Sequence, residues 1–260
     1  MAVSWIKTGA QSVSAAKQDE VEAQARKDGA GKMFRFWLKE KEEAKITFVD
    51  GDLQKTEGGT VLAPPRYYEH TVNLGGKWTN FVCPEKTSPE AGDKCPLCSA
   101  GDRSTLVALF TIIDHRSYTG KNDKVYVDQA RLLVAKPITM EMLTKIALKR
   151  GGLAGCTFDV SRMGDNSASV GSMFDFLEKN PIETLQQEYV HEVEEKGVKK
   201  MVSYFVAPDY EQEVVYRTGE ELQAMGLGKA VITTMNPGGG KGKEMFPGGA
   251  KSKSDYSKEL

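Results

Sequence analysis

Cysteine and histidine are scarce in this chain. Its 260 residues include 4 cysteines and 3 histidines. The cysteines have the pattern of metal ligands with one spare, Cys156, and not that of a disulfide framework, which favours a reducing compartment. We therefore expect a cytoplasmic protein whose few cysteines are candidates for a metal site.

Long apolar runs are missing as well. No stretch approaches the roughly 20 apolar residues that a membrane-spanning helix needs. The sequence starts M-A-V-S-W-I-K, without the apolar centre of a signal peptide. We expect neither secretion nor a membrane partner.

An excess of charge of one sign is also lacking, because the formal net charge is −1. Bulk charge therefore does not favour nucleic acid, although a local patch could still bind it, since the field at a cleft depends on where the charges lie. Residues 112–150 are the most basic long stretch, with eight Lys or Arg against four acidic residues.

Motifs of metal-dependent and phosphate-binding enzymes do not occur. The chain contains neither H-E-x-x-H nor G-x-x-x-x-G-K-[ST]. Zinc deaminases combine H-x-E with P-C-x-x-C, but His70 is followed by Thr71 and Val72, so the proton-shuttling glutamate is absent. We expect no enzymatic activity.

What the sequence does contain is a cluster of metal-ligating residues between positions 70 and 98. Cys95 and Cys98 form a C-x2-C motif, from which two thiolates can reach one tetrahedral ion. Pro96 helps to set the turn between them by fixing its own φ. His70 and Cys83 can supply the other two positions. A closed Cys3His set predicts one structural Zn2+, because no position is left for substrate.

Alternatives to this ligand set remain open. The thiols could be ordinary reduced cysteines or a redox pair, which would place C-x2-C at the start of a helix after a strand. Here a Pro- and Gly-rich loop precedes the motif and S-A-G-D follows it, which favours zinc. His115, 17 residues after Cys98, rivals His70 as the fourth ligand. Cys156 has no second cysteine close by and is expected to be a small buried residue.

The spacing of apolar residues and turn signals predicts a mainly β protein with a few helices. Strands are expected at 33–39, 44–49, 66–72, 77–82, 104–114, 124–135, 156–163, 169–176 and 199–207, helices at 137–150, over 181–195 and after Thr218, and a loop over 52–65. Many strands, with a zinc-binding loop inserted in one hairpin, fit an OB-fold-like, partly open Greek-key barrel.

Composition divides the chain into three regions. Residues 1–31 are expected to form a polar N-terminal arm. Residues 32–228 are expected to form the OB-fold core, with a zinc subdomain at about 64–103. Residues 229–260 are expected to form a flexible Gly- and Lys-rich tail, because they have little apolar surface to bury.

Aromatic and basic residues alternate in several of these strands. Side chains alternate between the two faces of a strand, so residues 33–39 are expected to bury Phe34, Phe36 and Leu38. A binding groove for single-stranded nucleic acid needs cations along the phosphates and aromatic rings under the bases. The residues expected to form it are Arg35, Trp37, Lys39, Arg66, Tyr67, Trp78, Arg116, Tyr118 and Lys121. Trp37 could instead be covered by a loop.

The pattern R-F-W-L-K-E-K-E-E-A-K-I-T-F-V-D-G, followed by E-H…C…C-P-L-C, resembles the zinc-containing, helix-destabilising single-stranded DNA-binding proteins of tailed bacteriophages. The zinc segment is the specific part of this resemblance, which covers residues 33–220 in outline. Its ligand order, with 12 residues between the first two, is similar to that family and implies His70, Cys83, Cys95 and Cys98 as ligands.

The resemblance implies an OB core that coats and protects single-stranded DNA in replication, recombination and repair, in the cytoplasm of a host cell. It also implies contacts with further copies of the chain along the strand, and with replication or recombination proteins through the tail. Two features depart from the family: members often end in an acidic tail, whereas this tail is Gly- and Lys-rich, and the N-terminal arm is not strongly basic.

A zinc-stabilised scaffold that binds other proteins, such as a replication or transcription accessory factor, is the competing function. Such a scaffold would need no exposed groove of aromatic and basic residues, so the exposure of those residues separates the two functions.

Overall fold

The computed structural model describes residues 32–74, 77–88, 92–119, 125–164, 166–195, 198–203 and 205–228, together with Val13, Ala16, Asp19, Glu20 and Asp123. Nearly all of the predicted N-terminal arm, the whole predicted tail and Lys121 lie outside the described residues. Among the helices of the described part, none has both the length and the apolar character needed to cross a membrane.

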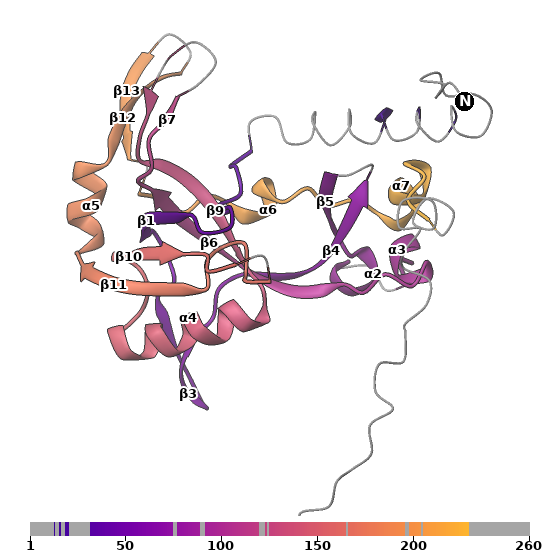
Figure 1. The fold of residues 1–260 in the computed structure, drawn as a ribbon, viewed down its shortest axis with the longest axis horizontal. Coiled ribbons are helices and arrows are strands. Elements are labelled where there is room, and N and C mark those ends of the chain that lie inside the picture. Colours follow the sequence, from indigo (N-terminus) through magenta and orange to yellow (C-terminus); the bar gives the residue numbers. More distant parts are fainter. Residues whose placement is uncertain are drawn as a thin grey trace, which may run out of the picture.

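A seven-stranded antiparallel sheet forms the centre of the molecule (Figure 1). Its strands are β1 (Glu43–Phe48), β4 (Arg66–Leu74), β5 (Lys77–Val82), β6 (Thr105–Asp114), β9 (Gln129–Ala135), β10 (Cys156–Ser161) and β11 (Met173–Lys179). They follow the order β11-β10-β1-β6-β4-β5, and β9 pairs with the other edge of β6. The predicted mainly β fold with few helices is confirmed.

Strand β6 connects the two halves of this sheet. One of its edges pairs first with β4, at Arg66↔Ala108, and further along with β1, at Phe48↔Ile112. Its residues 107–114 are all buried, as its continuous apolar run predicts for a strand covered on both faces. The metal-ligand segment on β4 and β5 is thereby attached to the main core through β6.

The segment before β1 is extended but makes only an isolated bridge, at Arg35↔Leu132. The backbone N–H of Phe36 donates to the carbonyl of Leu132 at 2.8 Å, and that of Leu38 donates to Ser169 at 2.7 Å. The segment therefore links β9 to the β10–β11 connection. Phe36 and Leu38 are buried as expected, but the prediction for Phe34 is wrong, because its side chain is 72% exposed beneath the guanidinium of Arg131.

Helix α4 (Pro137–Arg150) covers one face of the sheet and packs against β3, β6 and β9 (Figure 1). It starts with Pro137 at its first turn and ends at Gly151, whose φ of 69° is the left-handed conformation that favours glycine. The remaining helices are short: α2 (Pro84–Thr87), α3 (Pro96–Ser99), α5 (Ile182–Glu188), α6 (Tyr210–Glu213) and α7 (Gly219–Ala224).

Among the described residues, three two-stranded hairpins lie outside the central sheet. They are β2 (Leu53–Thr56) with β3 (Gly59–Leu62), β7 (Tyr118–Thr119) with β8 (Val125–Tyr126), and β12 (Val190–Glu195) with β13 (Val198–Ser203). The predicted loop over 52–65 is wrong, because the short turn before Gly59 allows the two flanks to pair. The predicted helix over 181–195 ends at Glu188, and the acidic strand after it pairs with a basic one through Glu192 and Lys199 at 2.8 Å.

The two end strands of the described sheet, β11 and β5, do not pair with each other. The described strands therefore show a large antiparallel sheet and no closed barrel, and the OB-fold-like Greek-key barrel stays a prediction.

Residues 205–228 return across the sheet and are fixed by a partly buried polar cluster. The Tyr210 hydroxyl donates to the Asp50 carboxylate and lies 2.8 Å from Thr111 Oγ1, while the Thr111 N–H donates to Asp50 Oδ1 at 3.1 Å. Burial raises the pKa of Asp50 from 3.8 to about 6, and the hydrogen bonds from Tyr210 and Thr111 offset only part of that effect.

This raised pKa predicts a pH-dependent contribution to stability. The folded state binds the Asp50 proton more tightly than the unfolded state does, so the contribution is complete below pH 4 and is lost as the pH rises through about 6. A raised carboxyl pKa of this size corresponds to about 2 to 3 kcal/mol. Asp50→Asn should remove this component, and urea unfolding between pH 4 and pH 7 measures it as a changing difference between wild type and variant. Parallel pH profiles would contradict the assignment.

Candidate metal centre and adjoining groove

Paired strands and two short helices bring the four predicted metal ligands together. His70 on β4 lies opposite Phe81 on β5, and Cys83 directly follows β5, where its N–H donates to the Tyr68 carbonyl at 2.8 Å. Cys83 and Cys95 each precede a one-turn helix that begins with proline. The fixed φ of proline suits the first position of a helix, so both cysteines occupy equivalent positions at a turn.

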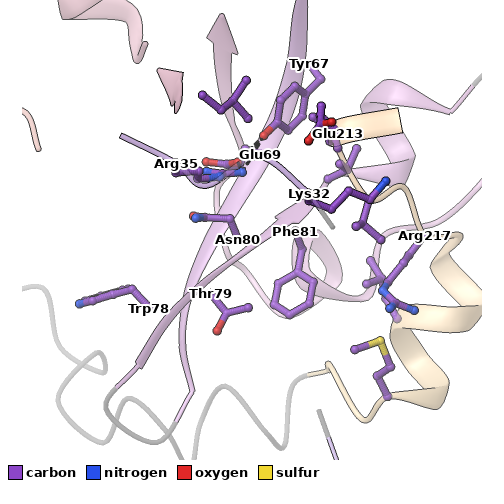
Figure 2. Close-up of a pocket in the computed structure, with 16 residues that line it drawn as sticks. Lys32, Arg35, Tyr67, Glu69, Trp78, Thr79, Asn80, Phe81, Glu213 and Arg217 are labelled. Carbon is purple, nitrogen blue, oxygen red and sulfur yellow. Dashed lines mark hydrogen bonds and ion pairs between the residues drawn. The ribbon is translucent and has the colours of Figure 1, made fainter. Parts of the chain in front are cut away.

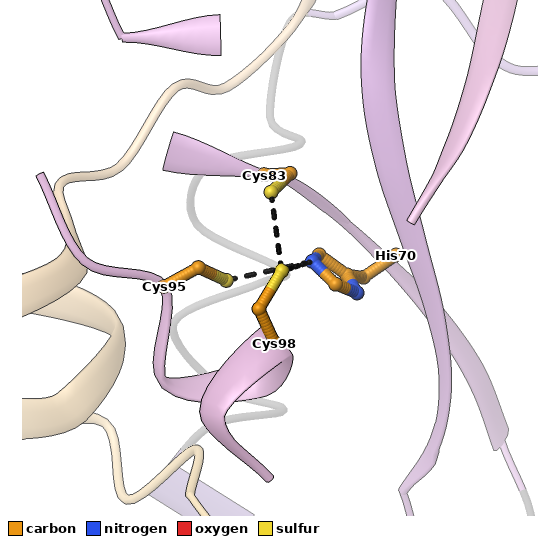
Figure 3. Close-up of side chains that lie close together, drawn as sticks. All are labelled: His70, Cys83, Cys95 and Cys98. Carbon is orange, nitrogen blue, oxygen red and sulfur yellow. Dashed lines mark hydrogen bonds between the residues drawn. The ribbon is translucent and has the colours of Figure 1, made fainter. Parts of the chain in front are cut away.

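The ligand atoms have the spacing of a four-coordinate site (Figure 3). His70 Nε2 lies 3.4 Å from Cys95 Sγ and 3.5 Å from Cys98 Sγ, and the sulfurs of Cys83 and Cys98 are 3.6 Å apart. All four atoms lie within 4.8 Å of one another. Tetrahedral bonds of ~2.3 Å to sulfur and ~2.0 Å to nitrogen would place ligand atoms roughly 3.6 to 3.8 Å apart. The cluster can therefore hold one metal ion.

A carboxylate fixes the histidine ring in the orientation that a metal ligand needs. His70 Nδ1 lies 2.6 Å from Asp102 Oδ2, while Nε2 points to the cysteines. The His70 side chain is fully buried and Asp102 is partly exposed. A proton on Nδ1, held by the carboxylate, leaves the lone pair of Nε2 for the ion, which is the usual arrangement behind a metal-bound histidine.

The buried thiols require a cation if they are to be ionised together. Burial raises the pKa of Cys98 to about 12, with a further contribution from its hydrogen bond to Cys83, and burial also raises the pKa of Cys95. A divalent ion reverses this effect, because it stabilises coordinating thiolates directly. Four ligands would close the coordination sphere of a tetrahedral ion and leave no position for a substrate.

The structure brings His70, and not His115, to the three cysteines. His115 lies elsewhere, with Nδ1 2.6 Å from Asp128 Oδ1 and Nε2 2.8 Å from Thr47 Oγ1. Cys156 is fully buried in the main core and its Sγ faces the Gly152 carbonyl at 3.5 Å. Its burial agrees with the expectation from sequence.

Two surface pockets share Arg35, and the first of them also contains Phe81, Leu222 and Met225 from the apolar cluster around the cysteines. We call the first the Trp78 pocket (Figure 2); it is lined by Lys32, Arg35, Tyr67, Glu69, residues 78–82, Leu132, residues 213–215, Arg217, Leu222 and Met225. We call the second the Trp37 pocket; it is lined by residues 34–37, Lys39, Glu42, Asp114, residues 116–118, Gln129 and Arg131. We call the two pockets together the groove; they adjoin at Arg35, and their linings include residues of β5, β9 and the segment before β1.

Four large aromatic side chains of this groove are exposed. Phe34 and Trp37 are 72% and 54% exposed, Trp78 is 66% exposed and Tyr118 is 58% exposed. A ring exposed to this extent costs little to bring against a ligand, because it has no core contacts to lose. Because Trp37 is exposed, the alternative in which a loop covers it does not hold for the described residues.

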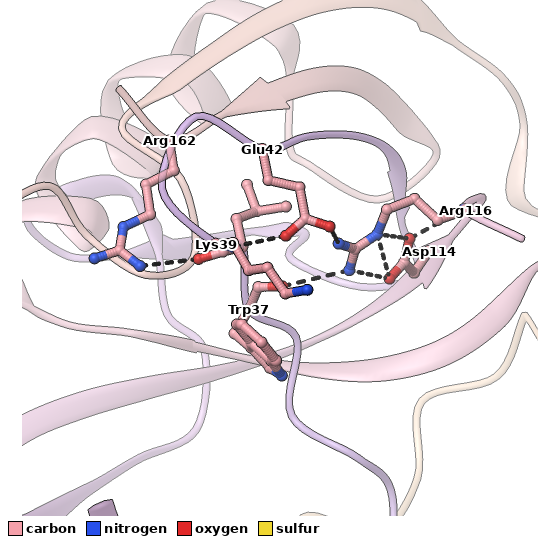
Figure 4. Close-up of polar contacts among 7 residues, drawn as sticks. Trp37, Lys39, Glu42, Asp114, Arg116 and Arg162 are labelled. Carbon is pink, nitrogen blue, oxygen red and sulfur yellow. Dashed lines mark hydrogen bonds and ion pairs between the residues drawn. The ribbon is translucent and has the colours of Figure 1, made fainter. Parts of the chain in front are cut away.

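Acidic residues hold two of the predicted cationic residues in place. Arg116 forms ion pairs with Asp114 at 2.6 Å and Glu42 at 2.7 Å, and it also contacts the Trp37 carbonyl (Figure 4). Arg35 pairs with Glu69 at 2.5 Å. The cations lining the two pockets are Lys32, Arg35, Lys39, Arg116, Arg131 and Arg217, and the carboxylates are Glu42, Glu69, Asp114 and Glu213. The groove is therefore modestly basic.

Seven of the nine predicted nucleic-acid contacts line the groove: Arg35, Trp37, Lys39, Tyr67, Trp78, Arg116 and Tyr118. Tyr67 is 8% exposed and packs with Val82 and Val107, so its ring supports the groove from within. Arg66 is exposed and lines neither pocket. The ninth, Lys121, lies outside the described residues.

Sequence reasoning missed four groove residues. Phe34 was assigned to the core by strict alternation, and Lys32 and Arg131 were not singled out. Arg217 comes from the segment before α7 and reaches the Trp78 pocket from a distant part of the sequence. The pairing of Arg131 with Phe34, 5.3 Å from ring to guanidinium, depends on tertiary packing and leaves no local signal.

Comparisons with protein-family models, curated proteins and solved structures give no match for this chain. The geometry of the metal centre and of the groove must therefore indicate what the protein does.

Proposed function

We propose that this protein binds single-stranded DNA without sequence specificity and holds a structural Zn2+ that stabilises one wall of the binding groove. The observation that carries the proposal is the set of four exposed aromatic rings that line, with six cations, two pockets adjoining at Arg35. Base stacking on such rings contributes about 1–3 kcal/mol per base and tolerates any sequence.

The cations supply the second part of the binding free energy. Contacts with phosphates release condensed counterions, so the affinity falls as salt rises. Arg35 and Arg116 are already paired with carboxylates, which lowers their attraction for a phosphate but fixes their positions. We therefore expect a moderate salt dependence, with stacking contributing a large share of the affinity.

Zinc is proposed because its preferred ligands are the ones present. Three thiols and one imidazole in a closed set suit tetrahedral Zn2+ and leave no position for a substrate. The ion would hold β4 and β5 at their junction with α2 and α3, and Trp78 lies on β5. Its binding free energy would then be part of the folding free energy of this segment.

The wider proposal follows the resemblance to the zinc-containing proteins of tailed bacteriophages. An OB-like core would coat and protect single strands in replication, recombination and repair, in the host cytoplasm, and further copies of the chain would follow along the strand. Replication or recombination proteins would be recruited through residues 229–260, a segment that contains cations as well as acids.

A fluorescence titration tests the function. Poly-dT should quench tryptophan emission at low salt, and added salt should restore it, because two of the three tryptophans lie in the groove. A duplex of equal length should quench much less, since its bases are not available for stacking. Unchanged emission at low salt would contradict the proposal and favour a protein-binding scaffold.

A further inference from the structure

We infer that Arg35 binds the phosphate at which a single strand passes from the Trp78 pocket to the Trp37 pocket. The inference rests on the proposed function and names the residue that connects its two stacking surfaces. Arg35 is the charged residue that lines both pockets among the described residues. Trp78 belongs to the pocket on one side, and Trp37 with Phe34 belongs to the other.

The guanidinium keeps donors for a ligand. Arg35 Nη2 donates to Glu69 Oε2 at 2.5 Å and to the Tyr67 hydroxyl at 2.9 Å (Figure 2). Both of these contacts, recorded among the described residues, use Nη2, and a guanidinium carries five N–H donors. The donors on Nε and Nη1 are therefore the ones that a phosphate could use. The side chain is 35% exposed, so a ligand can reach it.

The partners of Arg35 are rigid. Glu69 is 3% exposed and Tyr67 is 8% exposed, and the Tyr67 hydroxyl also donates to Glu69 Oε2 at 2.5 Å. Both residues lie on β4 at positions paired with β6, and Glu69 is also paired with β5. The long arginine side chain is thus held before a ligand arrives, which reduces the conformational entropy lost on binding. Lys39, by contrast, is exposed.

Strand β4 separates Arg35 and its two partners, Tyr67 and Glu69, from the metal centre. Residues on a strand alternate between faces. Tyr67 packs with Val82 and Val107 on one face, while Tyr68 packs with the apolar residues around the cysteines on the other. Glu69 directly precedes the ligand His70. A metal bound at His70 on one face of β4 would therefore help to fix Glu69 on the opposite face, and Glu69 is the carboxylate that positions Arg35.

A thermodynamic cycle tests the inference. The probe is a set of dT oligonucleotides in which one phosphate at a time is replaced by a neutral methylphosphonate. In wild type, replacement of one particular internal phosphate should weaken binding more than replacement of any other. In Arg35→Ala, replacement at that position should cost no more affinity than replacement at the neighbouring positions, because the arginine contact is already absent. The slope of log affinity against log salt should also fall in magnitude by about 0.7, which is one single-strand phosphate contact.

Two further variants make the test decisive. Arg35→Ala leaves the buried Glu69 without its cationic partner, so the double variant Arg35→Gln with Glu69→Gln removes both charges together and should show the same loss of slope. Lys55→Ala removes an exposed cation of β2 that lines neither pocket, and it should leave the internal position sensitive. Equal slope losses for Arg35 and Lys55, or an unchanged methylphosphonate profile in a folded Arg35 variant, would overturn the inference. Wild type that binds no dT would overturn the proposed function itself.

Discussion

Cys95→Ser and Cys98→Ser are each expected to abolish metal binding and to cause the largest loss of stability of any variant considered. The cluster has four ligands within 4.8 Å of one another, and the loss of one opens the coordination sphere. Structural zinc contributes roughly 10–16 kcal/mol in small zinc peptides. Here β4 is also held by its pairing with β5 and β6, so we expect a smaller loss, on the order of 5 kcal/mol. Metal analysis and thermal unfolding measure the two effects.

The consequences should spread to α7, because that helix packs on the metal segment. Leu222 and Leu227 share an apolar cluster with Cys83 and Cys95. Gly219 lies so close that a Cβ there would meet the Lys94 carbonyl at 1.9 Å. Faster hydrogen exchange over residues 219–227 in the serine variants, and in wild type treated with a chelator, is therefore expected.

Cys156→Ser is the matched control for these variants. Its thiol is also fully buried, but it belongs to the main core away from the cluster. It should lose stability without losing metal. Wild type with much less than about one zinc per chain, or equal metal loss in all three serine variants, would contradict the assigned centre.

The double variant Trp37→Ala with Trp78→Ala is expected to lose most of the affinity for single strands. Each ring is more than half exposed and belongs to a different pocket, so the two losses should be nearly additive. Stacking contributes about 1–3 kcal/mol per base, so each single variant should bind roughly 5- to 150-fold more weakly. The loss should be similar on dT, dA and mixed sequences, as measured by fluorescence anisotropy of labelled oligonucleotides.

Ile138→Ala controls for a general surface effect. Ile138 is 85% exposed on α4 and lines neither pocket, so its removal should leave the affinity unchanged. Thermal stability of the tryptophan variants should stay close to that of wild type, since exposed side chains contribute little to folding. If the double variant bound single strands as tightly as wild type, stacking on these rings would not contribute to binding, and the proposed role of the aromatic groove would be contradicted.

Many elements could be predicted from local patterns. The apolar run of β6, the β4–β5 hairpin, and α4 between Pro137 and Gly151 all carry strong sequence signals, and all three form as predicted. So does the start of α7, where Thr218 and Glu221 form a capping box. These signals are reliable because they depend on periodicity and caps within a few residues.

Other elements depended on partners distant in the sequence. Residues 190–195 pair with 198–203 although their acidic composition suggested a helix, because strand formation depends on the partner strand more than on the composition of the segment itself. Phe34 follows the alternation of its segment, but its side chain lies outside the core, beneath the guanidinium of Arg131 on β9. Neither outcome can be derived from a window of a few residues.

The three cysteines of the candidate metal centre could be identified from the sequence itself, since their residue type and their spacing within one hairpin and its following loop are enough to converge on an ion. The choice of His70 over His115, the burial of Tyr67, and the meeting of two pockets at Arg35 were decided only by the tertiary structure. The physical reason is that a metal site uses ligands that lie close along the chain, whereas a groove combines the exposed faces of segments that only long-range packing brings together.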